Sequence, residues 1–205
     1  MTPEQYSPLA LRTARRFDAH GDFIHAALGL ASEVTELSQV VNHRVHVLDE
    51  AGDMFWYLNL ATVSLGRGFA TLDDPEMRVH SGRPMNYLLE ELADAVSVVA
   101  DSAKKLMIAG AIKKHVELKI ALRVIFAITA ELLSRHALMV GEALHTNILK
   151  LSERYPELKF EAERALNVNH EAEAAATRQC TPNQIAESSD DGQCCGKCSN
   201  VTGAA

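Results

Sequence analysis

The sequence predicts an all-α protein, a bundle of about six helices followed by a disordered C-terminal tail. Apolar residues recur at three- and four-residue spacing through most of the chain from Thr2 to Val168. Alternating runs of β-branched residues, which would indicate strands, are nearly absent. With 205 residues and 47% apolar content, a single domain with a tail fits better than two domains. We expect the domain to cover 1–169 and the tail 170–205.

The first three helices are expected over about 3–19, 23–42 and 47–65. Thr2 is a good cap and Pro3 suits the first helical position, whereas His20-Gly21 is expected to interrupt the first helix. The third helix is apolar nearly all round, which is typical of a helix buried inside a bundle. Gly66-Arg67-Gly68 ends it.

Residues 69–84 contain two prolines, a glycine and paired aspartates, so we expect a surface connection there. Three further helices follow, over about 85–108, 112–134 and 140–154. Tyr155-Pro156 closes the last of them, because the residue before a proline disfavours helix. Beyond Asn169 the composition is polar, acidic and alanine-rich, which predicts disorder.

Charge and hydropathy exclude several classes of partner. The formal charge of -7 argues against a nucleic-acid polymer or an anionic membrane, because both reward clustered Lys and Arg. The first residues, 1–5, lack the basic and apolar regions of a secretory signal. The most apolar stretch, 120–133, is shorter than the roughly 20 residues that span a bilayer, and it contains Arg123. We therefore expect a cytoplasmic protein without a membrane partner.

The four cysteines all lie in the expected tail, at Cys180, Cys194, Cys195 and Cys198. The CxxC that ends the group supplies two zinc ligands, so a zinc site would need both other thiols. The alternative is a solvated tail with reduced thiols. We prefer it because the surrounding residues offer little to bury.

Two pairs of acidic residues stand on consecutive predicted helices. Glu33 and Glu36 lie three residues apart on the second helix. Glu50 and Asp53 have the same spacing on the third, and residues at this spacing share a helix face. At 100° per residue, Glu33 falls within an apolar stripe and Asp53 among core-facing residues. Burying an unpaired carboxylate costs several kcal/mol or keeps it protonated, so both positions require compensation.

A hard divalent cation would compensate these acids, because no Lys or Arg stands beside either pair except Arg44 in the connecting turn. Carboxylate oxygens suit Mg²⁺, with Mn²⁺ as a possible substitute. Magnesium commonly takes substrate phosphates as further ligands, so the metal predicts a phosphate-bearing substrate. The alternative is that all four acids are ordinary solvated residues, the usual fate of Glu on a helix.

Three runs of residues carry a family resemblance. LGLASEVTEL at 28–37 and DEAGDMFWYL at 49–58 give an ExxE, a short spacer and an ExxD. NILKLSERYP at 147–156 adds an Asn, a Lys-Leu and an Arg-Tyr-Pro in that order. In this order the runs resemble the MazG-like all-α nucleotide pyrophosphohydrolases. The likeness covers roughly 23–66 and 145–170.

The resemblance implies magnesium-dependent hydrolysis of (deoxy)nucleoside triphosphates to the monophosphate and pyrophosphate. It implies four metal ligands, Glu33, Glu36, Glu50 and Asp53. We expect catalytic roles for Glu36 and Glu50, because a carboxylate such as Glu36 can accept the proton of an attacking water. The nucleotide-binding positions that it implies are Tyr57, Asn147, Lys150 and Arg154. It also implies a homo-oligomer, a dimer or higher.

The long stretch before Asn147 departs from compact members of that family. Leu92-Ala93-Asp94-Ala95 is similar to Leu30-Ala31-Ser32-Glu33, and the predicted helix holding Glu117 is similar to the one holding Glu50. Residues 85–140 are therefore either a degenerate copy without metal ligands or an unrelated insertion. A copy would pack as an internal partner.

Other side chains suggest weaker alternatives. Glu142 and His145 form one ExxH, an element that di-iron bundle proteins supply twice. His43 and His46 are also three residues apart and could bind a metal. They lie in the turn between the acidic helices, where solvated histidines are common. Trp56 can stack on a base or pack in the core.

A function of another class is the alternative to an enzyme. The chain could be a non-catalytic nucleotide-sensing or protein-binding helical scaffold. The intact set of four acids favours the enzyme.

Overall fold

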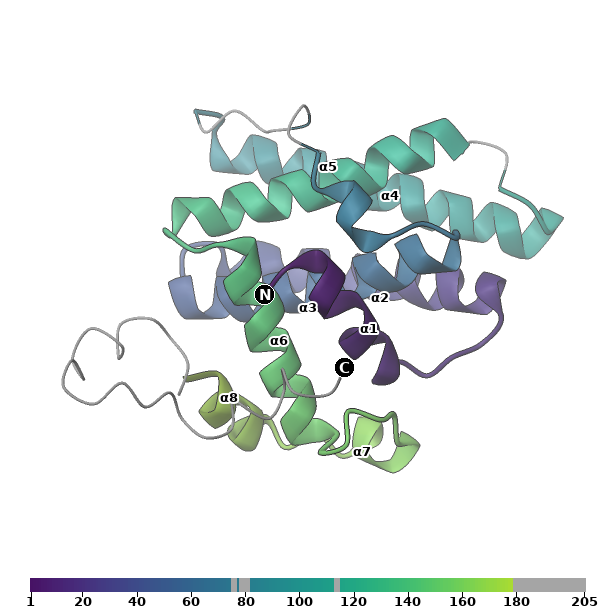
Figure 1. Cartoon of the computed structure of the whole chain (residues 1–205). Helices are drawn as coiled ribbons and strands as arrows, with labels where there is room; N and C mark the ends of the chain where they lie inside the picture. The colour runs from purple at the N-terminus through teal and green to yellow at the C-terminus, as the bar shows by residue number, and fades with distance from the viewer. Residues whose placement is uncertain (75–76, 78–81, 113–114, 179–205) are drawn as a thin grey trace.

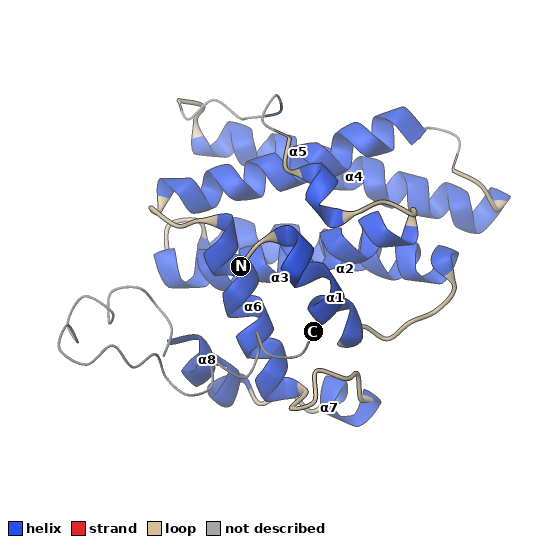
Figure 2. Cartoon of the chain, in the orientation of Figure 1, coloured by secondary structure: helices blue, strands red, loops and turns tan. Residues whose placement is uncertain are grey.

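The structure is a computed structural model that describes residues 1–74, 77, 82–112 and 115–178. Within these residues it contains eight α-helices, a short 3-10 helix and no strand (Figure 2). The predicted all-α class is confirmed. The helices outnumber the expected six because two short ones, α7 (Ala162–Leu166) and α8 (His170–Arg178), follow the sixth.

The remaining elements are α1 (Pro3–Arg12), α2 (Ala19–Val40), α3 (Arg44–Ser64), the 3-10 helix η1 (Phe69–Leu72), α4 (Met85–Ala109), α5 (His115–Arg135) and α6 (Val140–Arg154). Helix α2 packs against α3 and α4 packs against α5. The two pairs meet through α2 with α4 and through α3 with α5. Figure 1 shows the α4–α5 pair above the α2–α3 pair, with α6 descending past α3 toward α8.

Helix α3 is the central element of the bundle, as its nearly continuous apolar sequence predicts. It contacts α1, α2, α5 and α6, and its buried side chains include Met54, Phe55 and Leu58. It approaches α6 closely at Gly52, where a Cβ would lie 2.9 Å from the Cβ of Asn147. A glycine at this position therefore allows α6 to lie beside the acidic face of α3.

The break between the first two helices lies earlier than the sequence suggests. Residues 13–18 separate α1 from α2, so the predicted interruption at His20-Gly21 is wrong. The side chain of Asp18 accepts a hydrogen bond of 2.7 Å from the backbone N–H of Gly21. This cap starts the helix and offsets the low helix propensity of glycine. The buried Asp22 accepts a hydrogen bond of 2.8 Å from the N–H of Phe17, which fixes the preceding loop.

The connection at 69–84 contributes to the core, so its description as a surface connection is wrong for its first residues. Phe69 and Leu72 in η1 are buried. The Phe69 ring centroid lies between 5.8 and 6.3 Å from those of three core aromatics, Tyr6, Phe55 and Phe126. Turn-forming residues farther along this segment conceal the short apolar element that precedes them.

The segment from residue 170 begins with a helix, so the expected disorder is wrong for 170–178. In α8, Glu173 is buried and forms an ion pair with Arg154 of α6. The pair explains how a polar, alanine-rich helix docks on the bundle without a large apolar face. The rest of the predicted tail, 179–205, which holds the cysteines, lies outside the described residues.

None of the helices in the described part of the chain has the length and apolar character needed to cross a bilayer. Residues 85–140 supply α4 and α5, which cover the α2–α3 pair. Whether that segment is a degenerate copy or an insertion stays a prediction.

Candidate functional site

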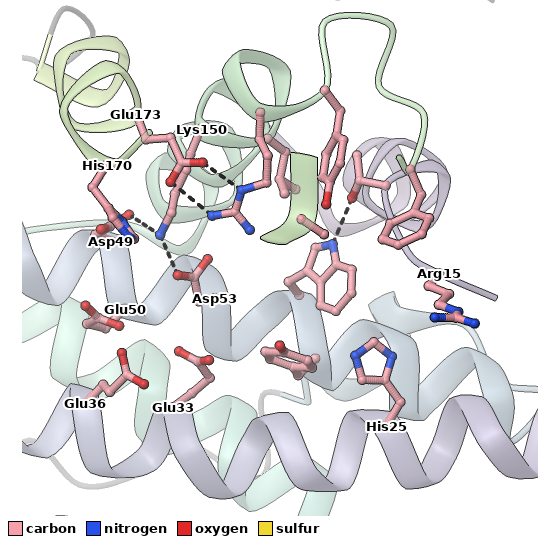
Figure 3. Close-up of a pocket in the computed structure, with 18 residues that line it drawn as sticks. Arg15, His25, Glu33, Glu36, Asp49, Glu50, Asp53, Lys150, His170 and Glu173 are labelled. Carbon is pink, nitrogen blue, oxygen red and sulfur yellow. Dashed lines mark hydrogen bonds and ion pairs between the residues drawn. The ribbon is translucent and has the colours of Figure 1, made fainter. Parts of the chain in front are cut away.

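Three of the four predicted acids converge between α2 and α3. One carboxylate oxygen from each of Glu33, Glu50 and Asp53 lies within 4.8 Å of the others. Figure 3 shows Glu33 projecting from α2 toward the two side chains from α3. Among the described residues, no other group of three or more His, Cys, Asp and Glu side chains is close enough to share a metal ion.

Glu36, the fourth predicted acid, lies beside this group and is more exposed. It lines the same cavity as Glu33 and Glu50, and its carboxylate projects toward them (Figure 3). It does not belong to the group of oxygens within 4.8 Å of one another. The structure therefore brings all four acids to one cavity and three of them to within the reach of a single cation.

Burial and mutual repulsion make Glu33, Glu50 and Asp53 hard to ionise. Burial raises the pKa of Glu33 from its ordinary value of 4.5 to about 8, and the charge of Asp53 adds to the effect. Burial, with the charges of Asp53 and Asp49, also raises the pKa of Glu50 to about 7. The pKa of Asp53 is raised by burial, although Lys150 opposes the rise. The cluster carries more negative charge than its surroundings compensate, and a proton or a cation has to balance it.

Both oxygens of Asp53 are held by side chains from α6. The amide of Asn147 donates to Oδ1 at 2.8 Å, and the Nζ of Lys150 donates to Oδ2 at 2.5 Å. The hydroxyl of Tyr6 donates to the Oδ1 of Asn147 at 2.7 Å, so the amide has one orientation. Asn147, which the resemblance places among the nucleotide-binding residues, is buried here and orients an acid of the cluster.

The two predicted phosphate-binding cations line the cavity, and both are already paired. Lys150 also donates to Asp49, at 3.0 Å. Burial disfavours its charge, but the carboxylates of Asp53 and Asp49 raise the pKa of Lys150 above its ordinary value. Arg154 donates two hydrogen bonds to the carboxylate of Glu173, of 2.7 and 3.0 Å. The structure thus supplies positive charge next to the acids, with an acidic partner on each cation.

The end of the cavity away from the acids is aromatic. The cavity has a volume of about 420 Å³, and Trp56, Tyr57 and His25 line it. The ring of His25 lies 6.0 Å from Trp56 and 5.7 Å from Tyr57 between centroids, edge-on to each. Tyr57 packs so closely on Gly29 that a Cβ there would lie 2.1 Å from its ring. Trp56 donates to the hydroxyl of Thr13 at 3.1 Å, so this ring is anchored as well as exposed to the cavity.

Among the acidic, basic and histidine side chains that line the cavity, sequence reasoning missed Arg15, His25, Asp49, His170 and Glu173. Asp49 had a usable signal, because it precedes Asp53 by four residues and so shares its helix face. His170 and Glu173 had none, because their segment looked disordered. The position of Arg15 depends on the loop after α1, whose course the sequence did not predict.

The other sequence candidates do not form metal sites in the described residues. The carboxylate of Glu142 accepts a hydrogen bond of 2.7 Å from the N–H of Met139, so it caps α6. His145 has a pKa lowered by burial, and neither residue joins a cluster of ligands. The rings of His43 and His46 lie 6.2 Å apart, again without a third ligand.

The donor set of the acidic cluster fits magnesium. The converging atoms are carboxylate oxygens, which hard divalent cations prefer, and no His or Cys belongs to the group. The three side chains that would hold the ion are Glu33, Glu50 and Asp53, with Glu36 beside them.

No family model, curated protein or solved structure matches the chain. The site is therefore interpreted from its own residues and their geometry.

Proposed function

We propose that this chain is a magnesium-dependent hydrolase that converts (deoxy)nucleoside triphosphates to the monophosphate and pyrophosphate. The observation that carries the proposal is the convergence of Glu33, Glu50 and Asp53 in a cavity that also holds Lys150 and Arg154. Three partly buried carboxylates at this separation are well compensated by a divalent cation. Because magnesium commonly takes phosphate oxygens as further ligands, the cation favours a polyphosphate substrate.

The neighbours of the cluster support a fixed metal site. Asn147 and Lys150 each engage a different oxygen of Asp53, which sets the orientation of its carboxylate. Glu50 lies beside it on α3, and Glu33 approaches both from α2. When bound, magnesium would supply positive charge that offsets the charge of the triphosphate.

The proposed reaction is attack of water on the α-phosphorus. The water oxygen forms a bond to that phosphorus, and the bond from phosphorus to the oxygen that bridges to the β-phosphate breaks. The bonding electron pair leaves with pyrophosphate. The proton of the water passes to a carboxylate, for which Glu36 is the best candidate because it lines the cavity and is exposed to solvent.

The aromatic end of the cavity supports a nucleoside rather than an inorganic substrate. Trp56 and Tyr57 line the same cavity as the acids and present ring surface to it. Aromatic side chains of this kind stack on planar bases. With the phosphates at the acids, the base would lie toward His25 and Trp56.

The test is a product assay with the full chain, magnesium and a panel of ribo- and deoxyribonucleoside triphosphates. We expect monophosphate and pyrophosphate in equal amounts, and no turnover after chelation. Glu50→Gln should lower kcat/KM about 100-fold or more. Glu90→Gln, which neutralises an exposed acid on α4, should leave it unchanged. A wild-type rate for Glu50→Gln, or no turnover of any nucleotide by the wild type, contradicts the proposal.

A further inference from the structure

Helix α8 places one buried carboxylate against the candidate site. The side chain of Glu173 is only 5% exposed, and its two oxygens accept from the Nε and Nη2 of Arg154. Its neighbour Glu171 on the same helix is exposed. In Figure 3 Glu173 reaches into the cavity from α8, on the side opposite Glu33 and Glu36.

This ion pair has the geometry that a phosphate would otherwise adopt. A carboxylate and a phosphate both present two oxygens to a guanidinium, and both bind it through two parallel hydrogen bonds. Lys150, the other cation beside the acids, is already shared by Asp49 and Asp53. A polyphosphate that enters the cavity must therefore compete with carboxylates of the protein for both cations.

The two cations differ in how readily they can be released. The partners of Lys150 lie on α3, the central helix of the bundle, so they are held in place by the core. The partner of Arg154 lies on α8, whose main contacts with the bundle are with α6. Moving α8 would free Arg154 without disturbing the acidic cluster.

We propose that α8 is an autoinhibitory arm, in which Glu173 occupies the phosphate position at Arg154 and is displaced when a polyphosphate binds. The inference rests on the proposed function, since it takes Arg154 as a phosphate ligand. It adds that the resting site is closed by the chain itself. It also follows that undocking α8 raises affinity for polyphosphate, because two events that exclude each other are coupled reciprocally.

The first measurement uses the wild-type full chain with magnesium and inorganic triphosphate as the probe. Hydrogen exchange at the backbone amides of 170–178 should become faster when triphosphate is added. Hydrogen exchange at the backbone amides of α3 should not become faster. Slower exchange in 170–178 would mean that α8 closes over the anion, and unchanged exchange would mean that the pair does not compete; either result overturns the proposal.

The second measurement compares Glu173→Gln with Glu171→Gln by calorimetric titration of triphosphate in magnesium. Glu173→Gln should bind about fivefold more tightly or better, because the neutral amide is a weaker competitor for Arg154. Glu171→Gln should bind as the wild type does. Equal or weaker binding by Glu173→Gln overturns the proposal.

The two proposals fail in different ways. Nucleotide turnover measured on the same samples tests the proposed function alone. Suppose that the wild type releases pyrophosphate, but Glu173→Gln binds triphosphate no more tightly and triphosphate does not change hydrogen exchange in α8. The autoinhibitory role of α8 is then wrong, and the proposed enzymatic function is unaffected. If triphosphate displaces α8 but no nucleotide is hydrolysed, the proposed enzymatic function is wrong, and the competition between Glu173 and phosphate is supported.

Discussion

The amide of Asn147 on α6 donates a 2.8 Å hydrogen bond to the carboxylate of Asp53 on α3, and the hydroxyl of Tyr6 on α1 holds that amide in place. The three residues link three helices to one oxygen of the acidic cluster. Tyr6 and Asn147 are both buried, so no water can replace a missing partner easily. The orientation of Asp53 is therefore set by Asn147 and, through Asn147, by Tyr6.

Tyr6→Phe should weaken magnesium binding several-fold. The substitution leaves the Oδ1 of Asn147 without its donor, so the amide can turn and Asp53 loses its fixed orientation. The free energy of unfolding should fall by about 1–2 kcal/mol, because a buried acceptor is left unpaired. Titration calorimetry with magnesium and a denaturant curve measure both effects.

The control for this variant is Tyr87→Phe, which removes the hydroxyl of an exposed tyrosine on α4. It should alter neither quantity. Equal magnesium affinity in wild type and Tyr6→Phe would show that the hydrogen bonds from Tyr6 through Asn147 do not position Asp53 as a metal ligand.

The acidic cluster should make stability depend on pH when divalent cations are removed. Glu33 has its pKa raised from 4.5 to about 8 and Glu50 has its pKa raised to about 7, so the folded chain binds these protons more tightly than the unfolded chain. Their contribution to stability is complete below about pH 4.5 and is lost as the pH rises through 7 and 8. Tm in a chelator should therefore fall as the pH rises from about 4.5 to about 8, and level off above that.

Magnesium should remove most of that fall, since it takes the place of the bound protons. Thermal melts at matched pH with magnesium and with chelator give the comparison. Glu33→Gln should melt with a shallower pH dependence in chelator. Parallel curves in magnesium and chelator would argue that no cation binds the cluster.

Lys150→Ala should destabilise the protein in the absence of magnesium. Lys150 neutralises Asp49 and Asp53, and breaking a largely buried pair leaves uncompensated charge, at about 2 kcal/mol or more. Lys104→Ala removes an exposed pair with Asp101 and should have little effect. Chemical denaturation distinguishes the two variants, and an unchanged midpoint for Lys150→Ala would contradict the role given to this pair.

Gly29→Ala should disturb the aromatic end of the cavity. A Cβ at this position would overlap the ring of Tyr57 at 2.1 Å, so the ring or the helix must move, at about 1–3 kcal/mol. Gly68→Ala is the matched control, because its Cβ would have no neighbour nearer than Thr71 at 3.9 Å. Melting curves and nucleotide kinetics should both change for Gly29→Ala alone; a variant with wild-type values in both would show that Tyr57 can relax freely.

Two truncations should separate α8 from the rest of the C-terminal segment. Removing 179–205 should leave the free energy of unfolding unchanged, as the polar composition predicts. Removing 170–205 should lower it, because Arg154 loses the buried partner that α8 supplies. Similar stability of the two truncated chains would show that α8 contributes nothing to the fold.

Much of the fold was predictable because its signals are local. Helix α6 covers Val140–Arg154 as the periodicity and the following Tyr155-Pro156 predict. The start of α2 was missed because the capping side chain of Asp18 outweighs a glycine that reads as a break. The buried η1 was missed because its four residues are too few to show a recurring apolar pattern.

The acidic pairs of the site were predictable from spacing along two helices, but their partners were not. Lys150 lies 97 residues from Asp53 in the sequence, and Glu173 joins Arg154 from a segment with no apolar pattern. Such contacts depend on how α6 and α8 pack, which residue spacing within one helix does not specify. The role of Asn147 is similar, since it is the packing of α6 at Gly52 that brings its amide within hydrogen-bond distance of Asp53.

The most direct test of the central claim is hydrolysis in water enriched in the heavy oxygen isotope, followed by phosphorus NMR of the products. Attack on the α-phosphorus, as proposed, puts the heavy oxygen in the nucleoside monophosphate and none in pyrophosphate. The label should appear only with magnesium present, and Glu50→Gln should form the labelled monophosphate at least about 100-fold more slowly. Label in pyrophosphate or in orthophosphate, or labelled monophosphate formed equally well by Glu50→Gln, would contradict the account of this site.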